Sequence, residues 1–226
     1  MFDLISNYHT KLLNAFWVTI ELTLYSAFWA LILGTVVAAM RVSPIPIARW
    51  IGTLYVNIIR NTPLTLIIVF CSLGLYSTLG LRLAPEGPDS ISENSFRFAI
   101  VGLSVYTAAF VCESLRSGIN TVPFGQSEAG RSLGFTFGQN LRFVVLPQAF
   151  RAVIAPLGSV FIALTKNSTI ASAIGVGEAA LLMSEMNENE AAVLNIGAIF
   201  ALGFIILTLP TGLLFGWLAK RFEVAR

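Results

Sequence analysis

The feature that most constrains this sequence is a series of apolar runs, each long enough to cross a lipid bilayer as a helix. A transmembrane helix needs about 20 predominantly apolar residues. Runs of this kind predict five spans, at residues 16–40, 51–83, 98–115, 152–183 and 195–218. Only 12% of the residues are charged, about half the share of a typical soluble domain. We therefore predict an all-α, polytopic membrane protein in which residues 1–226 form a single transmembrane domain.

Polar residues interrupt the second and fourth predicted spans. Non-helical backbone at membrane depth persists only where it is buried in protein or lines a wet cavity, and transporters often bind substrate groups at such broken helices. The candidate pathway residues at these two interruptions are Arg60, Asn61, Thr62, Lys166, Asn167 and Thr169. The alternative for a charged residue in a span is an ion pair, or snorkelling toward the headgroups. We favour a pair with Arg116 for Glu113, and leave both interpretations open for Glu21.

Lysine and arginine are distributed unequally between the segments that flank the spans. Cytoplasmic loops of membrane proteins carry an excess of these residues. Three lie in the N-terminal segment and after spans two and four, namely Lys11, Arg82 and Arg97. Nine follow spans one, three and five, namely Arg41, Arg49, Arg116, Arg131, Arg142, Arg151, Lys220, Arg221 and Arg226. We therefore predict that the N-terminus lies outside, the C-terminus lies in the cytoplasm, and residues 117–151 form the longest cytoplasmic segment.

The sequence lacks the residues that several kinds of chemistry require. The chain contains no G-x-x-x-x-G-K-[ST] motif, so any use of ATP is expected to require a partner. His9 is the only histidine, and Cys71 and Cys112 lie inside apolar runs, so we expect small buried thiols, no metal site and no cofactor. The net charge of +2 gives no reason to expect a nucleic-acid partner. The predicted spans hold neither His nor Asp, and we therefore do not expect an enzyme.

Residues 125–149 of the predicted cytoplasmic segment have the pattern of two short helices joined by a tight turn. Glu128 and Arg131 are three positions apart on one helical face, where they can form an ion pair. Gly134 suits the left-handed position that ends a helix, and Pro147 either disrupts the second helix or begins the next. Such an element suits docking to another protein, and the alternative is an ordered loop that only connects two spans.

The same stretch resembles the EAA loop of ABC-importer permeases, in which E-A-A is followed by three residues, G, nine residues and I-x-L-P. Here Gly130 and Val144 depart from the pattern, while the spacing is intact. In that family the loop docks into a groove on the ATP-binding subunit. The resemblance assigns the coupling role to Glu128, Ala129, Gly130, Arg131, Gly134, Leu146 and Pro147.

Further motifs extend the resemblance over nearly the whole chain. Residues 60–64, 113–119, 146–149 and 166–172 are similar to the R-G-T-P-L, E-x-x-R-x-G-I, L-P-Q-A and K-D-T-S-L-A-S elements of polar amino acid permeases. Residues 60–66, 70–72 and 165–169 look most like glutamate importers that use two different permease subunits. Asn167 stands where the general pattern has Asp, and Ile67 where many members have Gln, which favours a specialised substrate.

The resemblance implies a five-helix, type I ABC-importer permease in a bacterial cell membrane. The expected partners are two cytoplasmic ATP-binding subunits, a second homologous permease subunit and an extracytoplasmic solute-binding protein. The expected function is ATP-driven import of glutamate by alternating access. The alternatives are a permease for glutamine or aspartate and, more remotely, an ATP-independent transporter or channel.

Overall fold

The computed structural model describes residues 2–222, and no strand occurs among them. Residue 1 and residues 223–226 lie outside the described part, and so does Arg226 of the charge count. The helices are α1 (Phe2–Val42), α2 (Pro46–Arg60), α3 (Leu64–Val69), a π-helix (Phe70–Thr78), α4 (Ser90–Asn120), α5 (Phe124–Ser132), α6 (Phe137–Asn140), a second π-helix (Leu141–Val145), α7 (Leu146–Asn167), a 3₁₀-helix (Ser168–Ile174), α8 (Ala179–Asn189) and α9 (Val193–Phe222).

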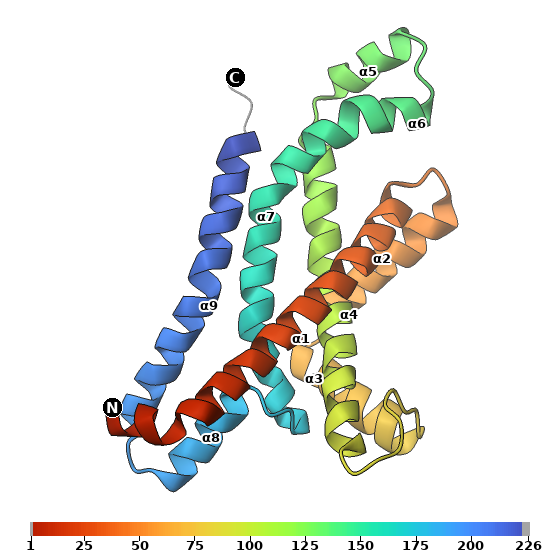
Figure 1. Cartoon of the computed structure of the whole chain (residues 1–226). Helices are drawn as coiled ribbons and strands as arrows, with labels where there is room; N and C mark the ends of the chain where they lie inside the picture. The colour runs from red at the N-terminus through yellow and green to blue at the C-terminus, as the bar shows by residue number, and fades with distance from the viewer. Residues whose placement is uncertain (1, 223–226) are drawn as a thin grey trace.

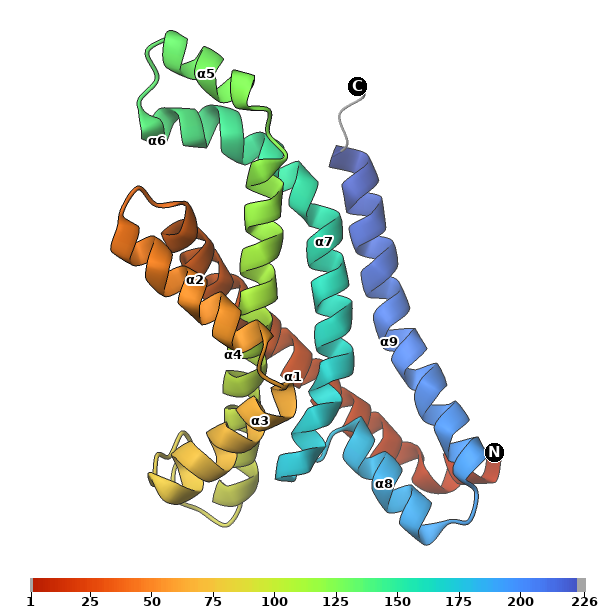
Figure 2. The same cartoon turned by 180° about the vertical axis from the view of Figure 1, so that it is seen from behind.

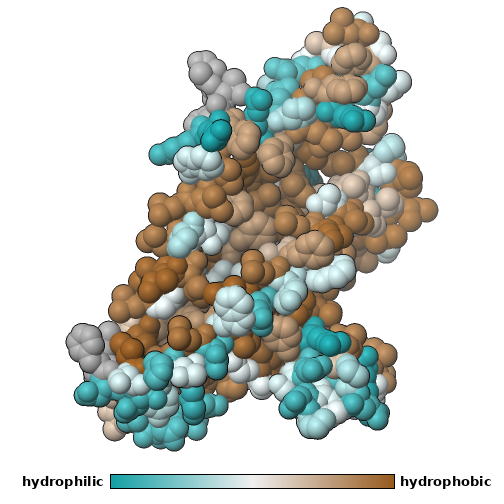
Figure 3. Space-filling view, viewed as in Figure 1, coloured by the Kyte–Doolittle hydropathy of each residue, from teal (hydrophilic) through white to brown (hydrophobic). Residues whose placement is uncertain are grey.

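An apolar band separates two more polar ends of the molecule (Figure 3). One end holds the α1–α2 turn, helices α5 and α6 and the end of α9, and the other holds the start of α1, the π-helix–α4 loop and α8 (Figure 1). The segments that are rich in lysine and arginine therefore lie together, opposite those that are poor in them. This grouping is what alternating membrane crossings require.

The predicted spans correspond to the apolar helices of the structure. Four continuous helical segments are long and apolar enough to cross a membrane: Asp3–Val42, Ser90–Asn120, Phe137–Ile174 and Val193–Phe222. The fifth crossing would be the pair Pro46–Arg60 and Leu64–Thr78, which is bent by 104°. The predicted interruption of the second span is therefore a sharp bend between two helices.

Several span boundaries differ from the prediction. The second span ends at Thr78 and not at residue 83, the third begins at Ser90 and not at residue 98, and the helical segment of the fourth begins at Phe137 and not at residue 152. Helix α1 begins at Phe2, well before residue 16, so its polar first turns are helical as well. The fourth span was expected to reach residue 183, but the continuous helix ends before Gly175, which adopts a left-handed conformation with φ of 79°. Helix α8 is a separate element that begins after Glu178, whose carboxylate accepts hydrogen bonds from the backbone N–H groups of Ala180 and Leu181.

Helix α4 lies at the centre of the packing. It crosses α1 over the largest helix–helix contact of the fold and packs next against α7, which in turn packs against α9 (Figure 2). Ala30, Ala108 and Val111 are fully buried at the α1–α4 crossing. A Cβ atom on Gly34 would lie 2.7 Å from the Val111 side chain, so this glycine allows the close approach of the two helices. Cys71 and Cys112 are both free and buried, as predicted.

Candidate functional site

The predicted docking element is a pair of short helices, α5 and α6, that projects beyond the end of α4 (Figure 1). Gly134 lies in the turn after α5 with φ of 83°, the left-handed conformation expected for it. The side chain of Thr136 accepts a hydrogen bond from the backbone N–H of Gln139, and the Gln139 side chain accepts one from the backbone N–H of Thr136. This capping box fixes where α6 begins.

The two short helices are held together by Asn140. Its side-chain amide donates hydrogen bonds to the carbonyl oxygen of Ser127, at 3.0 Å, and to the Ser127 hydroxyl, at 2.7 Å. Gly130 faces the same amide, and a Cβ atom there would come closer than 3.0 Å to Asn140 Oδ1. The departure of Gly130 from the E-A-A pattern therefore has a structural reason, because the Asn140 side chain occupies the space that an alanine methyl group needs.

The docking element is also joined to α7. The Gln148 side-chain amide donates a hydrogen bond to Gln126 Oε1 at 2.8 Å, which links the first turn of α7 to α5. Pro147 lies in that first turn, so it begins the new helix. A π-helical turn at Leu141–Val145 precedes it, since proline lacks the N–H group that an α-helix would use there.

The outer surface of the docking element combines charged and apolar side chains. Glu128, Ala129 and Arg131 are exposed. The predicted Glu128–Arg131 pair is wrong, because none of the ion pairs among residues 2–222 joins them; such an exposed pair would gain little free energy. Within residues 124–150, the exposed large apolar side chains are Phe124, Leu133, Phe137, Phe143, Leu146 and Phe150. Exposed apolar side chains that gather in this way are typical of interaction surfaces.

The α2–α3 bend is built by Asn61, Thr62 and Pro63. The Asn61 side-chain amide donates to the carbonyl oxygen of Asn57 at 2.7 Å, and the Thr62 hydroxyl donates to that of Ile58 at 2.8 Å. These bonds satisfy carbonyl groups that the end of α2 leaves without helical partners, and α3 starts after Pro63. Asn61 and Thr62 therefore stabilise the break, and their side chains bond back to α2.

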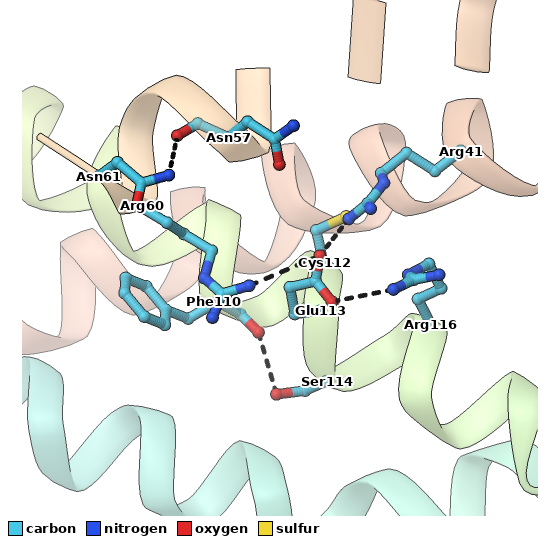
Figure 4. Close-up of polar contacts among 9 residues, drawn as sticks. All are labelled: Arg41, Asn57, Arg60, Asn61, Phe110, Cys112, Glu113, Ser114 and Arg116. Carbon is cyan, nitrogen blue, oxygen red and sulfur yellow. Dashed lines mark hydrogen bonds and ion pairs between the residues drawn. The ribbon is translucent and has the colours of Figure 1, made fainter. Parts of the chain in front are cut away.

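Arg60, the last residue of α2, belongs to a cluster around Glu113 of α4 (Figure 4). The predicted contact of Glu113 with Arg116 is present at 3.4 Å. Glu113 also forms an ion pair with Arg41 of α1, which no local pattern in the sequence indicates, and lies 3.8 Å from Arg60. The guanidinium group of Arg60 is placed over the ring of Phe110, 5.5 Å from its centre.

The second interruption lies at the end of α7, where the helix becomes 3₁₀ after Asn167. The Thr169 hydroxyl donates to the carbonyl oxygen of Lys166 at 2.7 Å, so Thr169 stabilises this transition. The Lys166 side chain is exposed, and no ion pair within residues 2–222 includes it. An uncompensated cation in a membrane-spanning segment marks a functional position by default.

A cavity of about 300 Å³ lies between α4 and α7 and reaches the second interruption at Asn167. Asn167 lies in its wall, and so does Phe110, the ring that carries the Arg60 guanidinium. Tyr106, Thr107 and Ser159 supply further polar atoms. Asn167 therefore lines the cavity, and Arg60 is linked to it only through the Phe110 ring. Lys166 and Thr169 are not among the lining residues.

Glu21 has a local partner at the other end of the molecule. Trp17 Nε1 donates a hydrogen bond to its carboxylate at 2.9 Å. Glu21 also lines a separate cavity of about 600 Å³ together with Glu93 and Arg97. It therefore lies away from the cavity between α4 and α7.

Sequence and structure comparisons point to one family. Residues 16–224 match the family described as binding-protein-dependent transport system inner membrane component. The glutamate transport system permease protein GluC of Corynebacterium efficiens is 60% identical over 220 residues, and that of Corynebacterium glutamicum is 58% identical over 218 residues, each covering 96% of both chains. The structure superposes on an amino acid ABC transporter with a TM-score of 0.86 at 26% identity, over 98% of both chains.

Proposed function

The chain belongs to the binding-protein-dependent transport system inner membrane components, and on that premise we propose that it imports glutamate. The family expected from the EAA-like loop is confirmed by this match over residues 16–224. The observation that carries the choice of glutamate is the 60% identity to a glutamate permease over 96% of both chains. The family consists of transporter subunits, which move their substrate across the membrane.

The family membership implies partners on both faces of the membrane. An importer of this kind works with ATP-binding subunits and with a substrate-binding protein. We propose two copies of the ATP-binding subunit and a second, homologous permease subunit. We also propose that the N-terminus faces outward and that α5 and α6 face the cytoplasm, which agrees with nine basic residues on one set of segments against three on the other.

The docking element is proposed to couple ATP-driven closure to the membrane helices. Exposed apolar side chains beside Glu128 and Arg131 give the ATP-binding subunit a surface that is both apolar and charged. The contacts of Asn140 with Ser127 and of Gln148 with Gln126 join α5 to α6 and α7. A displacement of α5 is thereby passed to α7, whose far end carries Lys166 and Asn167.

The substrate is proposed to pass through the cavity between α4 and α7. Its volume of about 300 Å³ suits a small amino acid, because small-molecule sites begin at about this size. Arg60 and Lys166 supply positive charge at the two interruptions. Asn167 replaces the Asp of the general pattern, which removes a negative charge that would repel the side-chain carboxylate of glutamate.

The test is uptake by the complete transporter reconstituted in proteoliposomes with saturated binding protein. We expect ATP-dependent uptake of labelled glutamate that unlabelled glutamate suppresses at lower concentration than glutamine or aspartate does. Uptake without ATP would contradict the importer class. Preferential suppression by glutamine or aspartate would instead identify the chain as a permease for that amino acid.

A further inference from the structure

We propose that the Glu113 carboxylate competes with the carboxylate of the departing amino acid for the Arg60 guanidinium. Glu113 is then a positioning residue that determines how readily the substrate leaves the cavity between α4 and α7. The inference rests on the proposed function and deepens it, because it assigns the release step to two named side chains.

The cluster around Glu113 has more positive than negative charge. Arg41, Arg60 and Arg116 contact one carboxylate, so the four side chains carry a net charge of +2 (three minus one). Excess positive charge near an apolar region attracts an anion more strongly than it would in water. A cluster that served only to hold three helices together would not need this excess.

Arg60 is the member of the cluster that is free to exchange partners. Its guanidinium lies 3.8 Å from Glu113, the longest of the three contacts, and its side chain is 46% exposed. Arg41 is only 10% exposed and is also within 3.9 Å of the Cys112 sulfur. Arg60 can therefore leave Glu113 while Arg41 and Arg116 still neutralise the carboxylate.

The position of Arg60 connects the cluster to the cavity. Its guanidinium covers the ring of Phe110, and that ring forms part of the cavity wall. Glu113 is seven residues before the end of α4, and Arg41 is one residue before the end of α1, so the cluster lies toward the end that carries α5 and α6. A carboxylate leaving the cavity in that direction meets Arg60, and Glu113 recovers the guanidinium as the carboxylate departs.

The experiment measures how glutamate inside proteoliposomes slows ATP-driven uptake of labelled glutamate by the complete transporter. Internal glutamate should slow the native transporter by reoccupying Arg60. Arg60→Gln should abolish this inhibition. Glu113→Asp keeps a negative charge for Arg41 and Arg116, but the shorter side chain moves the carboxylate away from Arg60. Inhibition should therefore set in at a roughly 2- to 5-fold lower concentration of internal glutamate, the range for a partly exposed ion pair.

Matched controls come from Arg82 and Glu86, an exposed ion pair outside the cluster. Arg82→Gln and Glu86→Asp make the same chemical changes and should leave the inhibition as it is in the native transporter. Arg60→Lys, which retains the charge, should restore part of the inhibition if Arg60→Gln proves poorly folded. If Arg60 only stabilises the fold, every folded variant should instead show the inhibition of the native transporter.

Three results would overturn the inference. One is equal inhibition in the native, Arg60→Gln and Glu113→Asp transporters, while glutamate import itself persists. Another is that Glu113→Asp weakens the inhibition. The third is that the Arg60 variants respond to the anionic lipid content of the vesicles and not to internal glutamate, which would identify a lipid phosphate as the bound anion. A native transporter that imports no glutamate at all would refute the proposed function instead.

Discussion

Replacing Gly130 with alanine, the residue of the E-A-A pattern at this position, should weaken docking of the ATP-binding subunit. The new methyl group would come closer than 3.0 Å to Asn140 Oδ1, and Asn140 is only 3% exposed, so the amide has no room to withdraw. Overpacking of this kind costs about 1–3 kcal/mol. Displacing the amide also threatens its two hydrogen bonds to Ser127, each worth about 1 kcal/mol.

The helical preference of alanine opposes this cost. Alanine is about 1 kcal/mol more favourable than glycine inside a helix, and Gly130 lies within α5. If one of the two hydrogen bonds is lost, the net cost is about 1–3 kcal/mol, which corresponds to a roughly 5- to 150-fold smaller fraction of docking elements in the native arrangement. The assay is the affinity of the ATP-binding subunit for permease complexes held in lipid nanodiscs.

A double-mutant cycle with Asn140→Ala isolates the contact. Asn140→Ala removes the clashing oxygen, which has no hydrogen-bond partner among residues 2–222, although it also removes the bonds to Ser127. Gly130→Ala should therefore cost nothing further in the Asn140→Ala background, and the two changes should be strongly non-additive. Native affinity in Gly130→Ala alone, or purely additive effects, would refute the argument from the close approach.

Three further predictions concern the turn, the orientation and the pathway. Gly134→Leu should leave the permease in the membrane but abolish transport, because leucine rarely adopts the left-handed conformation found here. Gly134→Asn should retain part of the uptake. Normal uptake by the leucine variant would exclude a coupling role for this turn. A cysteine at Ser90 should react with an impermeant thiol reagent added outside, whereas one at Ser132 should not; the reverse labelling would invert the proposed orientation. Lys166→Gln should raise the glutamate concentration needed for half-maximal uptake. Asn167→Asp should impair uptake of glutamate more than uptake of glutamine, because only glutamate brings a second carboxylate near the new charge. Equal effects on both amino acids would leave these two residues with a structural role.

Local patterns in the sequence predicted much of the fold. Apolar runs indicated where helices cross the membrane, because lipid excludes any backbone that does not satisfy its own hydrogen bonds. Gly134 was predictable for a similar reason, since the position after a short helix often requires a left-handed residue. The polar group before Pro63 indicated a break in the second span, but it contained no information on the bend of 104°.

Other features depend on contacts that the sequence does not display. The ion pair of Arg41 with Glu113 joins residues 72 positions apart, and only the α1–α4 crossing brings them together. The fourth span was overestimated because residues 179–183 continue the apolar pattern, while Gly175 and the cap formed by Glu178 end one helix and begin another. The space shared by Gly130 and Asn140 likewise arises from the folding of α5 onto α6.

The π-helical turn at Leu141–Val145 limits where the chain can change in length. A π-turn closes with i→i+5 hydrogen bonds and so holds one residue more than an α-helical turn. Deleting one residue there converts the turn to an α-helix and leaves both flanks facing as before. The same deletion between Pro147 and Asn167 rotates everything beyond it by about 100° and turns Asn167 away from the cavity. Between α6 and Asn167, one-residue deletions that preserve transport should therefore be confined to this turn, because α7 fixes the rotation of Asn167 relative to the docking element.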